Sequence, residues 1–190
     1  MKVFKFGGAS VKDAAGVKNL SSIVHQQHGQ LIVVVSAMGK TTNLLETLCN
    51  AYFHQDPKAT AIMKELKNFH LDIVNTLFPL NDTIHKHLEE LFTSLENILA
   101  SESSLCYDYE YDRIICFGEL ISTTIISDYL KMEGIENQFI DIRKFLKTDQ
   151  NYRNANIDLE LSEQLCKDAF DFNTSSVFVT QGFIAGTRTN

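Results

Sequence analysis

A lysine, two glycines and a serine near the N-terminus could together bind phosphate. Lys5 precedes Gly7 and Gly8, and Ser10 follows them. The glycines let the backbone turn tightly and approach a ligand closely, so that main-chain N–H groups can face an anion. Lys5 adds a positive charge and Ser10 adds a hydroxyl. The segment lacks the G-x-x-x-x-G-K-[ST] spacing of a P-loop, so we predict a phosphate cradle of another type.

A carboxylate in apolar surroundings is the second candidate for chemistry. Glu119 follows Gly118 inside residues 114–121, a segment that is otherwise almost entirely apolar. Burying a charge is costly unless the charge is paired. Two interpretations stay open: a surface glutamate beside a glycine kink in a helix, or a carboxylate that faces a cation such as a substrate ammonium group.

Hydroxyl groups follow an apolar run at residues 31–35. Those beside Gly39 are Ser36, Thr41 and Thr42. Any one of them could simply cap a helix, whereas the set could hydrogen-bond a polar substrate. Gly182 and Phe183 follow another apolar run, at 176–180, and could form a wall of the same pocket or an ordinary turn.

These candidates follow strands in an alternating pattern of strands and helices. Residues 3–6 and 31–35 are predicted strands, and the largely β-branched second run is typical of a strand buried on both faces. A helix with apolar residues at helical spacing separates them and ends before Gly29. The next helix begins near Asn43, with Thr41, Thr42 or Asn43 as its N-cap. Open α/β sheets bind ligands at the carboxyl ends of their strands, so we expect the candidates to converge there.

Two long amphipathic helices are predicted between about residues 57 and 101, with Pro79 ending the first of them. We expect this pair to be a helical hairpin inserted in the α/β pattern. The pattern then resumes with a mostly helical stretch at 109–133 that Gly118 interrupts. After it come a strand at 139–141, a helix at 157–172 and a strand at 176–180.

The chain ends at Asn190, soon after the last predicted strand. Parallel α/β sheets normally cover each strand with a following helix, and none follows here. We therefore expect the last strand to be an unprotected edge. Either the chain is part of a larger α/β domain, or something else completes the sheet.

Composition excludes several classes of function. Of 190 residues, 44% are hydrophobic and 22% are charged, which is typical of a globular domain rather than a disordered chain. The net charge of −7 disfavours nucleic-acid binding, which needs a basic field. No apolar stretch reaches the ~18 residues that span a bilayer, and no signal peptide is visible. We expect a cytoplasmic protein with no membrane partner.

Cysteines and histidines offer no metal site. The four cysteines lack C-x-x-C spacing and are expected to be reduced, mostly buried thiols. His85 and His87 would face different directions on a helix, and His25 and His28 have no third ligand nearby. We expect surface histidines, no metal ligands and no nucleophilic triad.

Four segments resemble those of aspartate kinases, members of the amino acid kinase superfamily, and occur in the same order. They are KFGGAS at 5–10, VVSAMGKTTNLL at 34–45, GELIS at 118–122 and TQGFI at 180–184. DIR at 141–143 is a weaker match. The segments span the whole chain, which makes the resemblance more specific than any single segment would be.

The resemblance implies a three-layer α/β/α fold around a mostly parallel sheet. It also implies transfer of the ATP γ-phosphoryl group to the β-carboxylate of L-aspartate, the entry step to lysine, threonine and methionine. Lys5 would stabilise the transferring phosphoryl group, and Glu119 would bind the substrate amino group. The nucleotide phosphates would contact Lys5, Gly7, Gly8 and Ser10. The aspartate site would be lined by Ser36, Thr42, Glu119, Gly182 and Phe183.

The resemblance further implies that Mg²⁺ accompanies ATP and that the complete enzyme is a homo-oligomer. The attacking group in such a reaction is a carboxylate, which is already ionised at neutral pH because its reference pKa is about 4. No general base is then required, which agrees with the lack of a recognisable triad.

The chain departs from the family pattern in two ways. Ala9 stands where the family usually has threonine, so one hydroxyl contact is lost. The family pattern also continues after 180–184 into a stretch resembling Gly-Arg-Gly-Gly-Ser-Asp, then a nucleotide-binding half and ACT regulatory domains. We therefore expect residues 1–190 to be the N-terminal, amino-acid-substrate part of a kinase domain, and to be inactive alone.

Two alternatives stay open. Another member of the superfamily could accept glutamate, acetylglutamate or UMP, although the segments at 34–45 and 118–122 argue against this. A non-catalytic binding or assembly module could keep the anion site without any activity.

Overall fold

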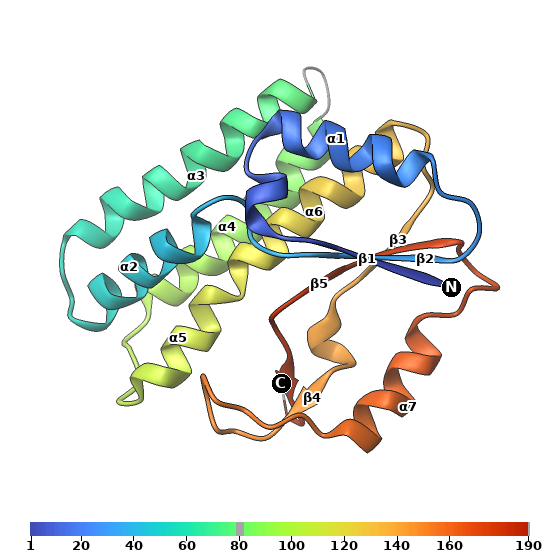
Figure 1. Ribbon diagram of the computed structural model, residues 1–190. Helices are drawn as coiled ribbons and strands as arrows, with labels where there is room; N and C mark the ends of the chain where they lie inside the picture. Colours follow the sequence, from blue (N-terminus) through green and yellow to red (C-terminus); the bar gives the residue numbers. More distant parts are fainter. Residues whose placement is uncertain (79–81, 190) are drawn as a thin grey trace.

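The computed structural model describes residues 1–78 and 82–189, and a parallel β-sheet lies at its centre (Figure 1). The strands run in the order β1-β2-β5-β3, and each neighbouring pair is parallel. Their bounds are Lys2–Phe6 for β1, Leu31–Val35 for β2, Gln138–Ile140 for β3 and Val177–Gln181 for β5. The predicted strands are therefore confirmed to within one residue.

The expectation that the last predicted strand is an unprotected edge is wrong. β5 pairs with β2 on one side and with β3 on the other, so β1 and β3 form the edges of this sheet. The chain leaves a gap beside β2 when it forms β3, and it returns later to fill that gap. Strand order in an open α/β sheet often differs from chain order for this reason.

Helices lie on both sides of the sheet, which gives the three layers that the resemblance implied (Figure 1). The smaller layer is α7, Leu159–Ala169. The larger layer consists of α1 Ala14–His25, α2 Thr41–Phe53, α3 Lys58–Leu77, α4 Asp82–Ala100, α5 Tyr107–Ile115 and α6 Phe117–Met132. Short elements complete the chain: the 3₁₀ helices η1 Gly8–Val11 and η2 Ile142–Lys144, and the paired strands β4 Lys147–Thr148 and β6 Gly186–Thr187.

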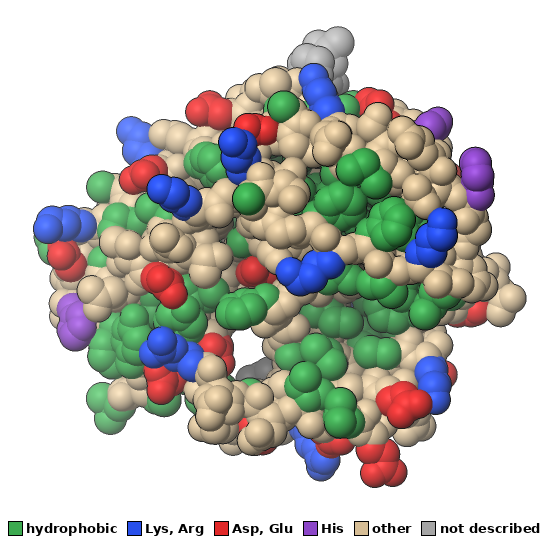
Figure 2. Space-filling view, in the orientation of Figure 1, with side chains coloured by type: hydrophobic (Ala, Val, Ile, Leu, Met, Phe, Trp, Pro, Cys, Tyr) green, Lys and Arg blue, Asp and Glu red, His purple; other side chains and the backbone are tan. Residues whose placement is uncertain are grey.

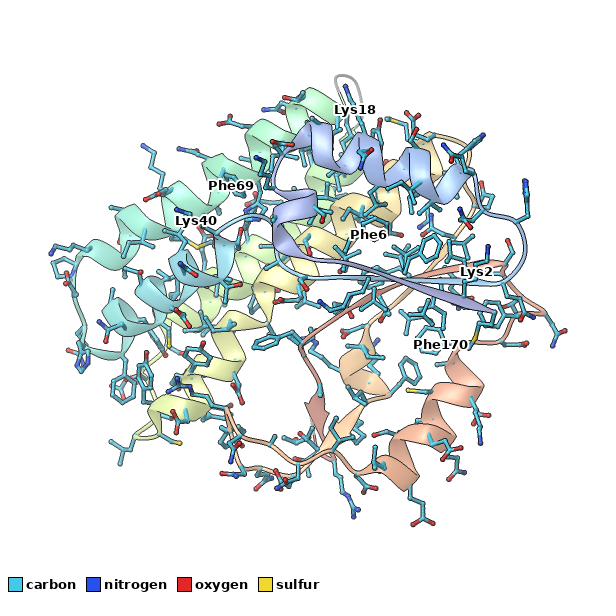
Figure 3. The ribbon with its side chains drawn as sticks, in the orientation of Figure 1. Lys2, Phe6, Lys18, Lys40, Phe69 and Phe170 are labelled. Carbon is cyan, nitrogen blue, oxygen red and sulfur yellow. The ribbon has the colours of Figure 1, made fainter. Side chains whose placement is uncertain are left out.

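Burial along β2 alternates rather than being complete on both faces. The fully buried residues of this strand are Leu31, Val33 and Val35. Ile32 and Val34 are only half-buried. Figure 3 places Phe6, the register partner of Val35, toward the larger helix layer and Phe170 on the opposite side. The prediction of burial is therefore confirmed for the face under the larger layer and wrong for the other.

Aromatic packing covers part of the second face. Phe170 and Phe172, which follow α7, meet the ring of Phe178 edge-on at centroid distances of 5.4 and 5.1 Å. Phe178 is in register with Ile32 and is fully buried. Farther along the strands, Val34 has Lys5 as its register neighbour on β1, and Lys5 is exposed. This face of the sheet is thus uncovered at Lys5, near the carboxyl end of β1.

The helical pair predicted at about 57–101 is confirmed as α3 and α4, and it belongs to the main core. Leu66, Val74, Leu88 and Phe92 are fully buried and are part of the same hydrophobic cluster as the sheet residues. The predicted helix end at Pro79 lies outside the described residues. Within those residues, no helix is both long enough and apolar enough to cross a bilayer.

The break in the next helical stretch falls at Cys116, between α5 and α6, and the predicted interruption at Gly118 is wrong. Gly118 lies in the first turn of α6, where a Cβ would come within 2.9 Å of the Ala37 Cβ. A glycine at this position lets α6 approach the loop after β2 closely. Gly118 therefore allows α6 to pack closely against the loop after β2, and it does not kink the helix.

Candidate active site

The loop after β1 packs directly on the loop after β2. A Cβ added at Gly8 would lie 2.6 Å from the Ala37 carbonyl oxygen, and the N–H of Gly39 donates to the Gly8 carbonyl at 3.0 Å. Gly7, by contrast, has no atom within 4 Å of the position that a Cβ would occupy. Gly8 is therefore required by the contact between the loops, while Gly7 leaves open space that a ligand could fill.

Lys5 and Ser10 flank this open space with exposed side chains. Among the described residues, no hydrogen bond or ion pair engages the Lys5 ammonium group. The N–H of Ser10 donates to the Gly7 carbonyl at 2.9 Å, so that particular N–H is not free for an anion. The predicted cradle thus keeps the lysine charge and the serine hydroxyl, and loses one of the expected backbone donors.

Ser36 begins the loop after β2 and is fixed from two sides. Its N–H donates to the Phe6 carbonyl at 3.1 Å, and its own carbonyl accepts from the Ser122 hydroxyl at 3.0 Å. Gly182 lies alongside, because its N–H donates to the Val35 carbonyl at 2.9 Å. A Cβ at Gly182 would be 3.7 Å from Ser36 Oγ. The structure therefore brings Ser36 and Gly182 together, as the sequence predicted.

Glu119 is buried in the first turn of α6, so its interpretation as a surface glutamate is wrong. The residue is only 2% exposed. Its Oε1 accepts a hydrogen bond from Ala37 N–H at 3.1 Å, whereas Oε2 is buried with no partner among the described residues. Burial raises the pKa of Glu119 above its ordinary value of 4.5, and the Ala37 N–H opposes part of that rise. An unpaired buried carboxylate oxygen is suited to a donor such as an ammonium group.

The two threonines that begin α2 have different environments. Thr41 is 2% exposed and points inward, whereas Thr42 is half-buried. The predicted N-caps Thr41, Thr42 and Asn43 are wrong, because Lys40 occupies the N-cap position and no side chain caps the first turn. The loop contacts of Ala37 and Gly39, rather than a capping hydroxyl, set where this helix begins.

Phe183 and Gly182 both line a hollow beside the end of β5. Phe183 is 81% exposed, with a φ of +69° that is uncommon for a residue with a Cβ. The hollow has a volume of about 600 Å³ and is lined by Ile115, Cys116, Leu146 and Ile184, among others. Figure 2 shows an opening in this region of the molecule. Gly182 and Phe183 therefore border the same hollow, and Gly182 also lies beside Ser36.

Sequence reasoning missed Gln181, a buried amide that ties the end of β5 to α6. Its Oε1 accepts from Ile142 N–H at 2.8 Å, and its Nε2 donates to Thr123 Oγ1 at 2.8 Å. The Thr123 hydroxyl donates in turn to the Glu119 carbonyl at 2.6 Å. Gln181 and Ser122 both fall within the segments that carried the resemblance, so a polar residue in an apolar segment was the available signal.

The expectation of surface histidines is wrong for His70, which is fully buried in α3. The cysteines are free, as predicted, although Cys106 is exposed. Over residues 1–78 and 82–189, no group of His, Cys, Asp or Glu side chains is placed to hold a metal ion. These residues therefore do not fit a resident metal site.

Comparison with known proteins identifies the family. The amino acid kinase family matches residues 1–190. The chain belongs to the amino acid kinase family. Membership agrees with the parallel sheet, the loops at its carboxyl edge and the helices on both faces.

Curated relatives of this amino acid kinase family member carry the name aspartokinase. A bifunctional aspartokinase/homoserine dehydrogenase of Buchnera aphidicola is 28% identical, covering 99% of this chain and 24% of that protein. Lysine-sensitive aspartokinase 3 of Escherichia coli is 27% identical, covering 96% of this chain and 40% of that protein. The chain thus spans less than half the length of either relative.

A solved structure shows the same fold. E. coli aspartokinase III in complex with aspartate and ADP superimposes with a TM-score of 0.88 at 24% identity, covering 99% of this chain and 42% of that one. The likeness supports the three-layer α/β/α architecture. The roles of the individual site residues stay predictions.

Proposed function

We propose that this chain forms the amino-acid-substrate part of an aspartate kinase. The reaction would transfer the γ-phosphoryl group of ATP to the β-carboxylate of L-aspartate and yield 4-phospho-L-aspartate. One observation carries the proposal: the unpaired Oε2 of Glu119, buried beside the loop that begins with Ser36 and leads into α2. The names of the curated relatives and the aspartate and ADP of the E. coli structure support it.

The carboxylate of Glu119 would bind the substrate ammonium group. Ion pairing and hydrogen bonding in a buried site orient a ligand strongly. The substrate ammonium group would also give Oε2 the hydrogen-bond partner that it lacks. Ser36 and Thr42 would hydrogen-bond the same substrate, and Gly182 would leave room for it beside Ser36. The substrate carboxylate would then point toward the loop after β1.

Lys5 would neutralise charge on the phosphoryl group during transfer. Phosphoryl transfer depends on positioning and electrostatic stabilisation rather than on a protein nucleophile. Lys5 is exposed at the carboxyl end of β1, and the space beside Gly7 is open to a phosphate. ATP would bring its own Mg²⁺.

The test uses the full-length protein that contains this chain, with ATP, Mg²⁺ and aspartate, and measures ADP formation. We expect aspartate-dependent turnover, and we expect Lys5→Ala to lower kcat by orders of magnitude. Lys2→Ala is the matched control and should leave kcat unchanged. It removes another exposed β1 lysine (labelled in Figure 3), whose ammonium group donates to the Gln27 side chain.

A panel of acceptors separates this proposal from its alternatives. Turnover with glutamate, acetylglutamate or UMP in place of aspartate would contradict the substrate assignment. Tight aspartate binding by an inactive full-length protein would favour a non-catalytic module. Residues 1–190 alone are expected to show no turnover, and robust ADP formation by them would overturn that expectation.

A further inference from the structure

His70 lies outside every segment that resembles the family, yet it contacts Thr41, the first residue of α2, beside the candidate site. The ring is fully buried in α3. Nδ1 lies 2.8 Å from the Leu66 carbonyl oxygen, and Nε2 lies 3.4 Å from the Thr41 hydroxyl oxygen. A carbonyl only accepts, so Nδ1 must carry the proton. Nε2 of the neutral ring then has a lone pair, and the Thr41 hydroxyl must donate to it.

The neutral ring is the form that the surroundings favour. Phe69 and Phe92 lie against the imidazole, with ring centroids 4.9 and 6.4 Å away. Burial lowers the pKa of His70 to about 4. At neutral pH, Nε2 is therefore an acceptor, and its partner is the first residue of α2.

Anchoring Thr41 determines where Thr42 points. Successive residues of an α-helix differ by about 100° around its axis, so Thr42 turns away when Thr41 faces His70. No side chain caps this end of α2, and the His70 contact adds a side-chain constraint on the first turn to the loop contacts that set where the helix begins. If the first turn rotated, the direction of the Thr42 hydroxyl would change with it.

The neighbour of His70 supports the same loop at a second point. A Cβ at Gly39 would lie 3.6 Å from Phe69, which places the Phe69 ring against the loop backbone where φ is +55°. Figure 3 shows Phe69 of α3 close to Lys40 of this loop. On the opposite side, the Glu119 carboxylate accepts a hydrogen bond from Ala37 N–H. The loop is thus held between α3 and α6.

We propose that His70 is a positioning residue for the substrate. Its Nε2 accepts a hydrogen bond from the Thr41 hydroxyl, and this bond fixes the first turn of α2 so that Thr42 faces the aspartate. The inference rests on the proposed function. His70 itself would not touch the substrate, so its loss should weaken substrate binding more than it slows the chemical step.

The main experiment measures KM for aspartate and kcat in the full-length protein. Thr41→Val and His70→Leu should each raise KM by up to about tenfold, the effect of losing one hydrogen bond, with kcat changed less than about twofold. Thr41→Ser keeps the hydroxyl and should resemble the wild type, and His70→Gln keeps an acceptor and should restore part of the binding. The double variant His70→Leu/Thr41→Val should be no worse than either single variant, because both remove the same bond.

A structural control separates positioning from general destabilisation. Val74→Ala removes buried volume one turn along α3 and should lower Tm without changing KM. Unchanged KM in both Thr41→Val and His70→Leu, or additive effects in the double variant, would overturn the inference. If the wild type shows no aspartate-dependent turnover, the proposed function fails instead.

Nitrogen NMR of the His70 ring in the 190-residue chain tests the contact without activity. We expect the proton on Nδ1, and a shift of the Nε2 resonance in Thr41→Val. A proton on Nε2 would contradict the arrangement, whatever the enzyme does.

Discussion

Replacing Glu119 with glutamine should stabilise the folded chain at neutral pH. The glutamine amide keeps the volume of the side chain and can keep an oxygen facing Ala37 N–H, 3.1 Å away in the wild type. It removes the charge on a group whose second oxygen is buried without a partner. A buried unsatisfied polar group costs about 1–3 kcal/mol and a charged one costs more. The glutamine NH₂ would also lack a partner, so we expect a net gain of about 1–2 kcal/mol.

The gain should depend on pH in a defined direction. Burial raises the pKa of Glu119 in the folded chain above 4.5. Between the unfolded and the folded pKa, the folded state holds a proton that the unfolded state has released, so wild-type stability falls as pH rises through this window. Glu119→Gln does not titrate. The difference between the two proteins should be close to zero at pH 4, should appear above pH 4.5 and should become constant above the folded pKa.

Urea unfolding of residues 1–190 at pH 4 and pH 7.5 measures this difference. At pH 7.5, a gain of 1–2 kcal/mol corresponds to a rise in Tm of about 2–8 °C for a domain of this size. Glu65→Gln is the matched control, because Glu65 is exposed on α3 and its substitution should change stability by less than about 0.5 kcal/mol. The reasoning is refuted if Glu119→Gln is no more stable than the wild type at pH 7.5, or if its gain is equally large at pH 4.

Two further predictions concern the interior and the loops. Burial keeps His70 neutral in the folded chain down to about pH 4, whereas its ordinary pKa is 6.5. As pH falls from 6.5 to 4, the free energy of unfolding of the wild type should therefore fall by about 3 kcal/mol relative to that of His70→Leu. A difference in urea unfolding that does not change with pH would contradict this. Gly8→Ala should cost about 1–3 kcal/mol because its Cβ would meet the Ala37 carbonyl oxygen at 2.6 Å. Gly7→Ala, which meets no atom within 4 Å, should be nearly neutral, and equal losses in the two variants would refute the packing argument.

The sequence was sufficient where the signal is local. The apolar run of β2 and the apolar stripes of α3 and α4 predicted these elements almost to their ends, because the spacing of apolar residues follows the pattern of burial in a strand or helix. The loops after β1, β2 and β5 were also predicted to converge, since parallel strands end at one edge of a sheet. Gly182 and Ser36 bear this out by lying side by side.

Features that depend on tertiary packing could not be predicted in this way. Nothing in the residues of β5 indicates that it fits between β2 and β3. The start of α2 at Thr41, with Lys40 as its N-cap, is set by the contacts of Ala37 and Gly39 in the preceding loop, which override the capping preference of Thr41. His70 gave no signal because a single histidine on an amphipathic helix is compatible with either face.

The central place of β5 has a consequence for how the chain folds. β2 and β3 have no hydrogen bonds to each other and share only β5 as a neighbour, which is synthesised about 140 residues after β2. At a synthesis rate of roughly 5–20 residues per second, one edge of β2 stays unpaired for many seconds during translation, until β5 has been made. Such long-range parallel pairing is slow and leaves a strand edge open to aggregation. We expect nascent chains shorter than about 180 residues to depend on chaperones, even though their helices can already form.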